Sequence, residues 1–280
     1  MTKNQSTLRD HALAFHALHV PGRPLVLPNA WDAVSARLAE DAGAAAVATT
    51  SAGLAWALGA VDGDRLDRDR ALEAVGRIVA TVRVPVSADI ESGYAEDPAG
   101  VADTVRAVLA AGAVGVNIED ALYGEEESGP LRSVAGQAER IAAARAAADA
   151  EGVPLFVNAR IDTILRAAGG VDATLERAAA FRAAGADGIF VPGVVDPETV
   201  KALVEGVDGP LNVLVGPGAP AVAELAALGV ARVSAGSGLA EAAHASVRCA
   251  ARELLDAGTY GALAGGLGYG ELNTLLARES

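Results

Sequence analysis

Short apolar runs alternate with longer amphipathic stretches along most of the chain. The runs are rich in Val, Ile and Leu, as buried parallel strands are, and the stretches between them have the period of a helix. Eight runs predict strands, at residues 24–29, 45–50, 84–89, 114–119, 155–160, 188–191, 211–215 and 231–234. Helices are predicted near residues 32–42, 68–81, 98–111, 134–150, 172–184, 197–205, 219–227 and 238–256.

Each predicted strand is followed by a helix, which is the order of a (β/α)₈ TIM barrel. The alternative is an open doubly wound sheet, but no Gly-x-Gly-x-x-Gly motif follows an early strand. We therefore expect an α/β protein with one barrel domain over residues 1–256. The remainder, 257–280, is Gly-rich and then apolar, and we expect a short helical extension that serves as an oligomer arm or, alternatively, a frayed terminus.

The composition excludes several classes of partner and site. A formal net charge of −14 would repel nucleic acid and anionic membranes, and no apolar run reaches the roughly 20 residues of a membrane span. The single cysteine, Cys249, rules out an intrachain disulfide and a cysteine-based zinc site. Since the N-terminal stretch also lacks the apolar core of a signal peptide, we expect a protein of the cytoplasm that binds small molecules.

Acidic residues stand at the carboxyl ends of two neighbouring predicted strands, where barrel enzymes carry their chemistry. Asp89 and Glu91 are two residues apart and therefore point the same way in extended chain, and Glu119 ends the next strand. Three carboxylates in one small volume favour a hard cation, Mg²⁺ or Mn²⁺. The alternative is that each carboxylate caps a helix or pairs with an arginine.

Two further strand ends carry groups that suit an anionic substrate. Arg160 ends the fifth predicted strand and could hold a carboxylate in bidentate fashion, or else pair with Glu119 or Asp162. Residues 50–53, Thr-Ser-Ala-Gly, offer hydroxyl and backbone N–H groups in a predicted loop, which could hold a carboxylate or an oxyanion.

Several mechanisms are excluded because the residues that they need are missing. The only lysines are Lys3 and Lys201, and neither follows a predicted strand, so no lysine is placed for imine chemistry. His11, His16 and His19 lie in a leading helix before the first predicted strand, and His244 and Cys249 lie in the last predicted helix, which argues against a catalytic triad. The remaining groups are carboxylates, arginine, hydroxyls and backbone, and these are suited to stabilising an enolate around a metal ion.

Five segments together resemble the isocitrate lyase/phosphoenolpyruvate mutase superfamily, in order and across nearly the whole chain: Leu-Pro-Asn-Ala-Trp-Asp at 27–32, Thr-Thr-Ser-Ala-Gly at 49–53, Asp-Ile-Glu-Ser-Gly-Tyr at 89–94, Asn-Ile-Glu-Asp at 117–120 and Asn-Ala-Arg at 158–160. Members of the superfamily are Mg²⁺-dependent barrels that act on 2-oxo acids through an enolpyruvate-like intermediate. The resemblance therefore implies the same fold, cofactor and chemistry here.

The resemblance also implies residue roles. Asp89 would be the principal metal ligand and would lie against the substrate, while Asp62, Glu91 and Glu119 would bind the metal through water. The substrate carboxylate would be held by Thr50, Ser51 and Ala52, and its oxyanion or phosphonyl end would face the catalytic side chain of Arg160. The superfamily's habit of exchanging helices suggests a homotetramer built as a dimer of dimers, or a dimer.

One departure from the superfamily limits the prediction. Its lyases carry a Lys-Lys/Arg-Cys-Gly-His motif after the fourth strand, whereas residues 121–131 contain no Lys, Cys or His. The phosphoryl-gripping Lys and Asn of the mutase branch are missing as well. Tyr94 and Tyr123 are the candidate proton donors in place of the missing cysteine.

We expect a Mg²⁺-dependent lyase that cleaves a C–C bond in a small 2-oxo or 2-hydroxy acid, with decarboxylation of an oxaloacetate-like substrate as the subtype least affected by the missing cysteine. The alternatives are a P–C bond enzyme, phosphonopyruvate hydrolase or phosphoenolpyruvate mutase, and a non-catalytic homologue that binds oxo acids.

Overall fold

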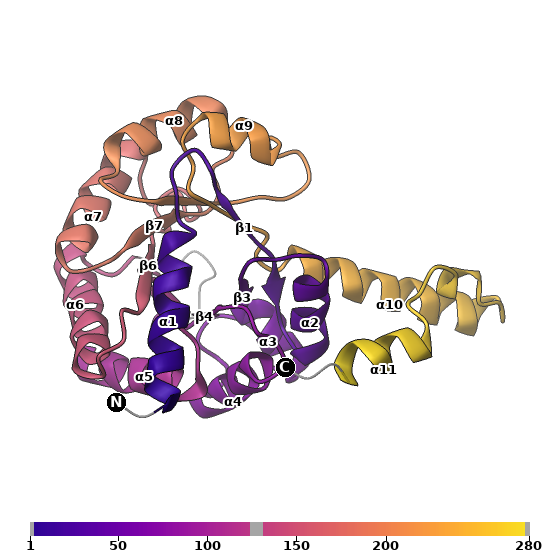
Figure 1. Cartoon of the computed structure of the whole chain (residues 1–280). Coiled ribbons are helices and arrows are strands. Elements are labelled where there is room, and N and C mark those ends of the chain that lie inside the picture. The colour runs from indigo at the N-terminus through magenta and orange to yellow at the C-terminus, as the bar shows by residue number, and fades with distance from the viewer. Residues whose placement is uncertain (1–2, 124–130, 278–280) are drawn as a thin grey trace.

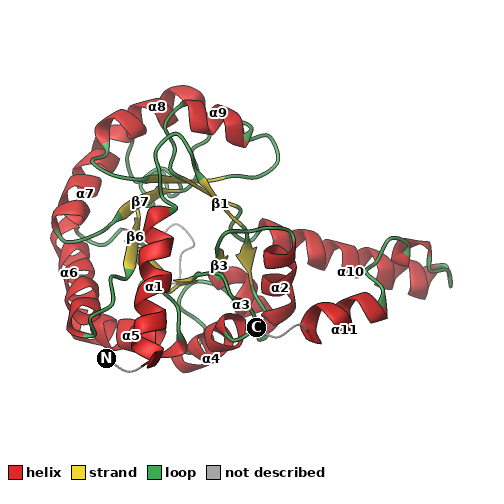
Figure 2. Ribbon diagram, viewed as in Figure 1, coloured by secondary structure: helices red, strands yellow, loops and turns green. Residues whose placement is uncertain are grey.

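Nine parallel strands form one sheet in the computed structural model, which describes residues 3–123 and 131–277. They lie inside a ring of helices (Figure 2). The strands are β1 (Leu25–Leu27), β2 (Asn29–Ala30), β3 (Val47–Thr49), β4 (Val86–Asp89), β5 (Gly115–Glu119), β6 (Phe156–Arg160), β7 (Gly188–Val191), β8 (Leu211–Leu214) and β9 (Arg232–Ser234). Every predicted strand is present.

A proline divides the first predicted strand into β1 and β2. β1 pairs with β9 and β2 pairs with β3, and the residue between them is Pro28, which has no backbone N–H to donate. The carbonyl of Pro28 still accepts a hydrogen bond from the backbone N–H of Ala48 at 3.2 Å. β1 and β2 are therefore two halves of one strand that joins the ends of the sheet, and the predicted (β/α)₈ barrel is confirmed.

The helices follow the predicted alternation, and α3 (Ser51–Ala57) is the one that lies where a loop was predicted. None of the described helices has the length and apolar character needed to cross a membrane. Those matching predicted ranges are α2 (Ala33–Asp41), α4 (Arg68–Val79), α5 (Pro98–Ala111), α6 (Val134–Ala150), α7 (Val171–Ala183), α8 (Pro197–Gly206), α9 (Val222–Ala227) and α10 (Gly238–Asp256).

The N-terminal helix α1 (Lys3–Ala17) lies across the end of the barrel where the strands begin (Figure 1). The His16 ring contacts the Pro154 carbonyl at 3.0 Å, and the Arg9 guanidinium donates to the Gly152 carbonyl at 3.2 Å, both just before β6. His19, which follows the helix, stacks on Phe156 with ring centroids 3.8 Å apart. Because α1 covers this end, the opposite end, where the strands terminate, is the one open to substrate.

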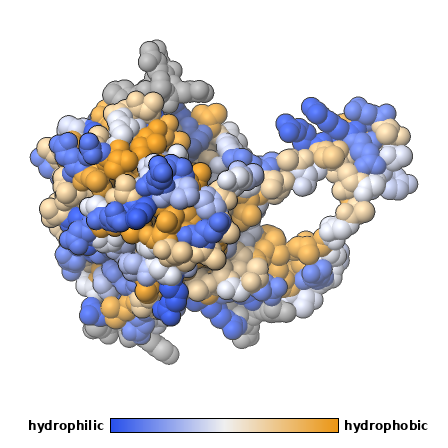
Figure 3. All heavy atoms as spheres, turned by 90° about the horizontal axis from the view of Figure 1, so that it is seen from above, coloured by the Kyte–Doolittle hydropathy of each residue, from blue (hydrophilic) through white to orange (hydrophobic). Residues whose placement is uncertain are grey.

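The last barrel helix does not pack on the barrel. α10 projects away from the body, and α11 (Tyr269–Ala277) returns toward α2 after a short 3₁₀ turn, η1 (Gly261–Leu263) (Figures 1 and 3). Only Ala240 of α10 is buried, whereas Leu275 of α11 is buried and its carbonyl accepts a hydrogen bond from Arg37 Nε at 3.1 Å. We call residues 238–277 the arm. The arm is anchored to the body at both of its ends.

The buried ring of His19 makes the stability of the barrel sensitive to acid. Burial, with a smaller effect from the charge of Arg232, lowers the pKa of His19 to about 3 from the 6.5 of an exposed imidazole. The folded state therefore favours the neutral ring. This contribution is complete above pH 6.5 and is lost as the pH falls toward 3, at up to about 1.4 kcal/mol per pH unit.

We predict that His19→Gln unfolds in urea with a smaller loss of stability between pH 7 and pH 5 than the wild-type protein. His244→Gln, which changes an exposed histidine, is the control, and its stability should fall between pH 7 and pH 5 by as much as that of the wild-type protein. Equal losses in His19→Gln and wild type would show that protonation of His19 does not oppose folding.

Candidate functional site

The predicted site residues come together where β3 to β6 end. Backbone pairing sets Asp89 beside Asn117 and Glu119 beside Arg160, so the acids at the ends of β4 and β5 lie next to the guanidinium at the end of β6. Arg160 Nη1 and Glu119 Oε2 are 2.7 Å apart. The ends of adjacent parallel strands thus place two acids and one arginine side by side, as the sequence predicted.

Asp89 is fixed by backbone groups on both sides of its strand. Its backbone N–H donates to Thr49 Oγ1 at 2.8 Å, and its carboxylate accepts from the backbone N–H groups of Ser51 and Glu91, each at 3.3 Å. Burial raises the pKa of Asp89, the charge of Arg160 lowers it, and the charge of Asp62 raises it again. Asp62, an exposed residue, is therefore close enough to act on Asp89.

Residues 50–53 form the start of a helix, so the predicted loop at this point is wrong. Thr50 is the N-cap of α3, and its hydroxyl accepts a hydrogen bond from the Gly53 backbone N–H at 3.5 Å. The first-turn N–H groups of a helix have no partners within it, and that of Ser51 points to Asp89. Thr50 and Ser51 are buried next to the acids, and Ala52 belongs to the same turn.

Glu91 lies in a strained turn and is held by two donors. Its φ of 51° and the φ of 50° at Tyr94 are both in the left-handed region, which is costly for residues with a side chain. The Tyr94 hydroxyl donates to Glu91 Oε1 at 3.1 Å, and the backbone N–H of Asp64 donates to Oε2. The pKa of Glu91 is raised to about 8, chiefly by burial and in smaller part by the charges of Asp62, Asp64 and Asp89, while the hydrogen bond from the Asp64 N–H opposes the rise.

Asp64 is a member of the cluster that the sequence interpretation missed. Its carboxylate accepts hydrogen bonds from the hydroxyl and the backbone N–H of Ser92, and burial raises its pKa. The signal was available, because Asp64 lies two residues after the predicted ligand Asp62, across a glycine. Asp64 thereby connects the segment before α4 to the turn that carries Glu91.

The carboxylate of Glu119 is bound by two neighbouring side chains, those of Arg160 and Tyr123. Besides its ion pair with Arg160, it accepts a hydrogen bond from the Tyr123 hydroxyl. Burial raises the pKa of Glu119, and the nearby Arg160 guanidinium opposes that rise. Burial and the charge of Glu119 in turn raise the pKa of Tyr123, so its hydroxyl keeps its proton at neutral pH.

In this structure Arg160 pairs with both of the acids that the sequence offered as its alternative partners. Its Nε and Nη2 atoms donate to the two carboxylate oxygens of Asp162 at 2.7 and 2.9 Å, while Nη1 faces Glu119. Asp162 is fully buried. The guanidinium is thus held in one orientation by two carboxylates in this structure.

The acids suit a hard cation but do not enclose one. Among the described residues, no three Asp, Glu, His or Cys side chains surround a common point as metal ligands do. The ligand chemistry nevertheless fits Mg²⁺, because the cluster is composed of oxygen donors without sulfur or imidazole. Burial and mutual repulsion raise the pKa values of Asp89 and Glu91, so their ionised forms are disfavoured without a counter-charge, and a divalent cation would favour them.

Arg140 organises the turn that carries the acids. This α6 side chain is 2% exposed, and its guanidinium donates to the carbonyls of Ser92, Ala95 and Glu96 at 2.5, 2.8 and 3.2 Å. These carbonyls belong to the same turn as the strained residues Glu91 and Tyr94. Arg140 therefore stabilises a backbone conformation that would otherwise be unfavourable.

A family model described as phosphoenolpyruvate phosphomutase matches residues 15–255. The chain belongs to this family. An uncharacterized protein of Mycobacterium tuberculosis is 40% identical over 241 residues, covering 84% of this chain and 88% of that one. The 2-methylisocitrate lyase of Escherichia coli is 31% identical over 209 residues (73% and 70%), and the oxaloacetate decarboxylase of Pseudomonas fluorescens is 32% identical over 217 residues (75% and 73%).

Solved structures of the family have the same fold. A Burkholderia cenocepacia protein provisionally described as a lyase/mutase superposes with a TM-score of 0.90 at 40% identity, over 97% of each chain. Phosphonopyruvate hydrolase in complex with oxalate and Mg²⁺ has a TM-score of 0.81 at 27% identity, over 95% of this chain and 94% of that one. Membership of the isocitrate lyase/phosphoenolpyruvate mutase superfamily, and with it the prediction of an enzyme, is confirmed.

We predict that Arg140→Met destabilises the protein by roughly 2–5 kcal/mol, because several buried carbonyls lose a charged donor. Hydrogen exchange should increase in the segment 90–97, where those carbonyls lie. Arg182→Met is the matched control, since Arg182 donates to the carbonyls of Asp208 and Ala186 near the opposite end of the barrel. The control should leave exchange in 90–97 unchanged. A normal exchange rate there in Arg140→Met would contradict the role given to Arg140.

Proposed function

We propose that the protein is a Mg²⁺-dependent lyase that acts on a small 2-oxo or 2-hydroxy carboxylic acid through an enolpyruvate-like intermediate. One observation carries the proposal: Asp89, Glu91 and Glu119 form a buried, oxygen-only acidic cluster beside Arg160 at the open end of the barrel. The complex of the related phosphonopyruvate hydrolase with oxalate and Mg²⁺ supports the choice of cation and of ligand class.

In this proposal the acidic residues of the cluster bind the metal, and residues at the start of α3 bind the substrate. Asp89 would bind Mg²⁺, or Mn²⁺, directly, with Asp62, Glu91 and Glu119 acting through water. The metal would supply a Lewis acid that stabilises the enolate. Thr50, Ser51 and Ala52, at the start of α3, would hold the substrate carboxylate close to Asp89, which receives the Ser51 N–H.

Arg160 would face the oxyanion end of the substrate. Its guanidinium is already held by Asp162 through Nε and Nη2 and pairs with Glu119 through Nη1, so that its positive charge has a fixed position beside the acidic cluster. A guanidinium that is positioned before the substrate arrives stabilises developing negative charge without reorganisation.

Tyr94 and Tyr123 are the proposed proton donors. Each hydroxyl is bonded to a glutamate of the cluster, Tyr94 to Glu91 and Tyr123 to Glu119. Burial raises both tyrosine pKa values, so both groups carry a proton at neutral pH. Residues 124–130, where the lyases carry part of their Lys-Lys/Arg-Cys-Gly-His motif, lie outside the described residues, and the chain has no Lys, Cys or His there.

Decarboxylation of an oxaloacetate-like acid is the subtype that we favour, because it needs metal chelation and one proton donor but no cysteine. A relative with this chemistry in its name, the oxaloacetate decarboxylase of Pseudomonas fluorescens, matches three quarters of the chain. P–C bond chemistry is the second candidate, and the related phosphonopyruvate hydrolase favours it.

We predict Mg²⁺-dependent binding of oxalate in calorimetry, abolished by EDTA and restored by Mn²⁺. With Mg²⁺, the protein should release pyruvate from oxaloacetate or an alkylmalate above the rate of a protein-free Mg²⁺ blank. Asp89→Asn should lower kcat/KM at least about 100-fold, since Lewis-acid stabilisation contributes several kcal/mol. Asp69→Asn, an exposed acid with the same charge change, should behave as wild type.

The alternatives give different products. Release of phosphate from phosphonopyruvate, without turnover of oxaloacetate, would identify the protein as an enzyme that hydrolyses a P–C bond. Oxalate binding that requires Mg²⁺ but is accompanied by no turnover of any oxo acid would identify a non-catalytic homologue. If oxalate does not bind with either metal, the metal site itself is refuted.

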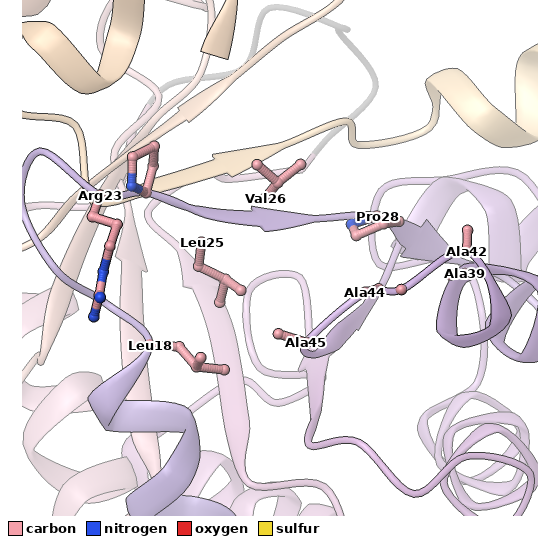
Figure 4. Close-up of a pocket in the computed structure, with 11 residues that line it drawn as sticks. Leu18, Arg23, Leu25, Val26, Pro28, Ala39, Ala42, Ala44 and Ala45 are labelled. Carbon is pink, nitrogen blue, oxygen red and sulfur yellow. The ribbon is translucent and has the colours of Figure 1, made fainter. Parts of the chain in front are cut away.

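We also propose that the arm joins two copies of the chain by helix exchange. An apolar groove of about 430 Å³ lies beside β1, bordered by Leu18, Val26 and Ala39 (Figure 4). The chain's own α10 projects away from the body (Figure 1). α10 carries apolar side chains in solvent, of which Val247 is 67% and Leu255 is 82% exposed. The exposed apolar side chains of α10 in a second copy would cover such an apolar groove.

We predict a dimer or tetramer by sedimentation and light scattering. Val247→Asp should shift the mass toward the monomer, because it places a charge in the proposed interface. Leu13→Asp, which changes an exposed apolar residue on α1, is the control and should keep the wild-type mass. A wild-type protein that stays monomeric at micromolar concentration would rule out the exchange.

A further inference from the structure

A second buried ion pair lies behind the acidic cluster and has no part in the proposed chemistry. Asp120, the residue after Glu119, is fully buried. Its Oδ2 accepts a hydrogen bond from Arg177 Nη1 of α7 at 3.0 Å, and its Oδ1 accepts one from the Asp162 backbone N–H at 2.9 Å. Removing either charged partner would leave the other buried without compensation, which is costly.

Arg177 also fixes the chain where it returns from residues 121–131. The same Nη1 atom donates to the carbonyl of Arg132 at 2.9 Å, and the backbone N–H of Arg132 donates to the carbonyl of Asp120 at 2.8 Å. Ala121 and Leu131, the neighbours of Asp120 and Arg132, form an antiparallel β-bridge. One guanidinium therefore contacts both ends of the segment that leaves β5.

The ion pair is connected to Arg160 by an unbroken series of contacts. Asp120 receives the backbone N–H of Asp162, and the side chain of Asp162 holds Arg160 through two hydrogen bonds. A further contact runs from the Asp120 backbone N–H to the Arg160 carbonyl at 3.3 Å. Neither carboxylate oxygen of Asp120 points to the acidic cluster, since Asp162 and Arg177 occupy one each.

We propose that Arg177 is a positioning residue, which acts through Asp120 and Asp162 to orient the Arg160 guanidinium toward the substrate. The inference rests on the proposed role of Arg160 as a substrate-binding group. The hydrogen bonds that a guanidinium makes depend on the orientation of its plane. The Asp162 carboxylate sets that orientation for Arg160, so a shift of Asp162 would move the Arg160 charge relative to the substrate.

The chain contains a control with the same chemistry at the other end of the barrel. Asp187 accepts hydrogen bonds from Arg145 of α6 and, at 2.8 Å, from the backbone N–H of Val157. This pair also joins a helix to two adjacent strands, but it lies where the strands begin. Arg145→Met therefore removes an ion pair of the same kind, although a more exposed one, without touching the site.

The test compares Arg177→Met, Arg177→Lys and Arg145→Met in Mg²⁺-dependent turnover. Arg177→Met should lower kcat/KM roughly 10- to 100-fold, as the loss of an outer partner of a catalytic group does. Arg177→Lys should retain part of the activity. The kcat/KM of Arg145→Met should stay within about twofold of the wild-type value, even if its melting temperature falls as much as that of Arg177→Met. Equal activity losses in the two Met variants would reduce Arg177 to a structural role.

A double-mutant cycle with Arg160→Lys separates positioning from destabilisation. If Arg177 acts through Arg160, adding Arg177→Met to Arg160→Lys should change kcat/KM by no more than about twofold. A loss in the double variant that equals the product of the two single losses would overturn the proposal.

Hydrogen exchange tests the same connection without turnover, so that a failure of the proposed function does not hide the result. In Arg177→Met, exchange at the Asp162 amide should accelerate, because its acceptor Asp120 has lost its counter-charge. The same amide should stay protected in Arg145→Met. Unchanged protection in both variants would show that Arg177 does not hold Asp162 in place.

Discussion

The site depends on how a few arginines compensate a dense group of buried acids. Arg160 is the cation inside the group, and it contacts Glu119 and Asp162 while its charge acts on Asp89. Arg140 and Arg177 lie outside the group and make different contacts: the first donates to backbone carbonyls of the turn after β4, and the second pairs with Asp120. The acids still outnumber these cations, and this surplus of buried carboxyl groups supports the proposed binding of a divalent metal ion.

The same compensation explains why strained backbone persists at this end of the barrel. Glu91 and Tyr94 have positive φ, a conformation that survives only where surrounding contacts impose it. Arg140 donates to carbonyls of the turn, Thr104 donates to the Gly93 carbonyl at 2.9 Å, and the Tyr94 hydroxyl is bonded back to Glu91. The turn is thus fixed by contacts to α5 and α6, and the carboxylate of Glu91 is directed inward at the cost of local strain.

Most of the fold could be predicted from the sequence, because period and strand length are local properties. All eight strand positions followed from apolar runs, and only the break at Pro28 altered their count. α3 was missed since its seven residues begin directly at the end of a strand and give too little helical period. In the site, residues at strand ends were predictable, whereas Asp120 and Arg177 are 57 positions apart and meet only in three dimensions. The direction of α10 could not be predicted either, because its amphipathic pattern suits the chain's own barrel and a second copy equally well.

The positions of two tyrosines bear on the absence of the lyase Lys-Lys/Arg-Cys-Gly-His motif. The sequence left open how a proton could reach the substrate without the lyase cysteine. In the structure, the hydroxyls of Tyr94 and Tyr123 each donate to a glutamate of the cluster, so both proposed proton donors lie beside carboxylates that would take part in holding the metal. The metal would supply a Lewis acid that stabilises the enolate, while Tyr94 and Tyr123 would hold the proton at their hydroxyl oxygens. The proposed donors lie in the turns after β4 and β5, so the missing lyase cysteine does not leave the proposed reaction without a proton source.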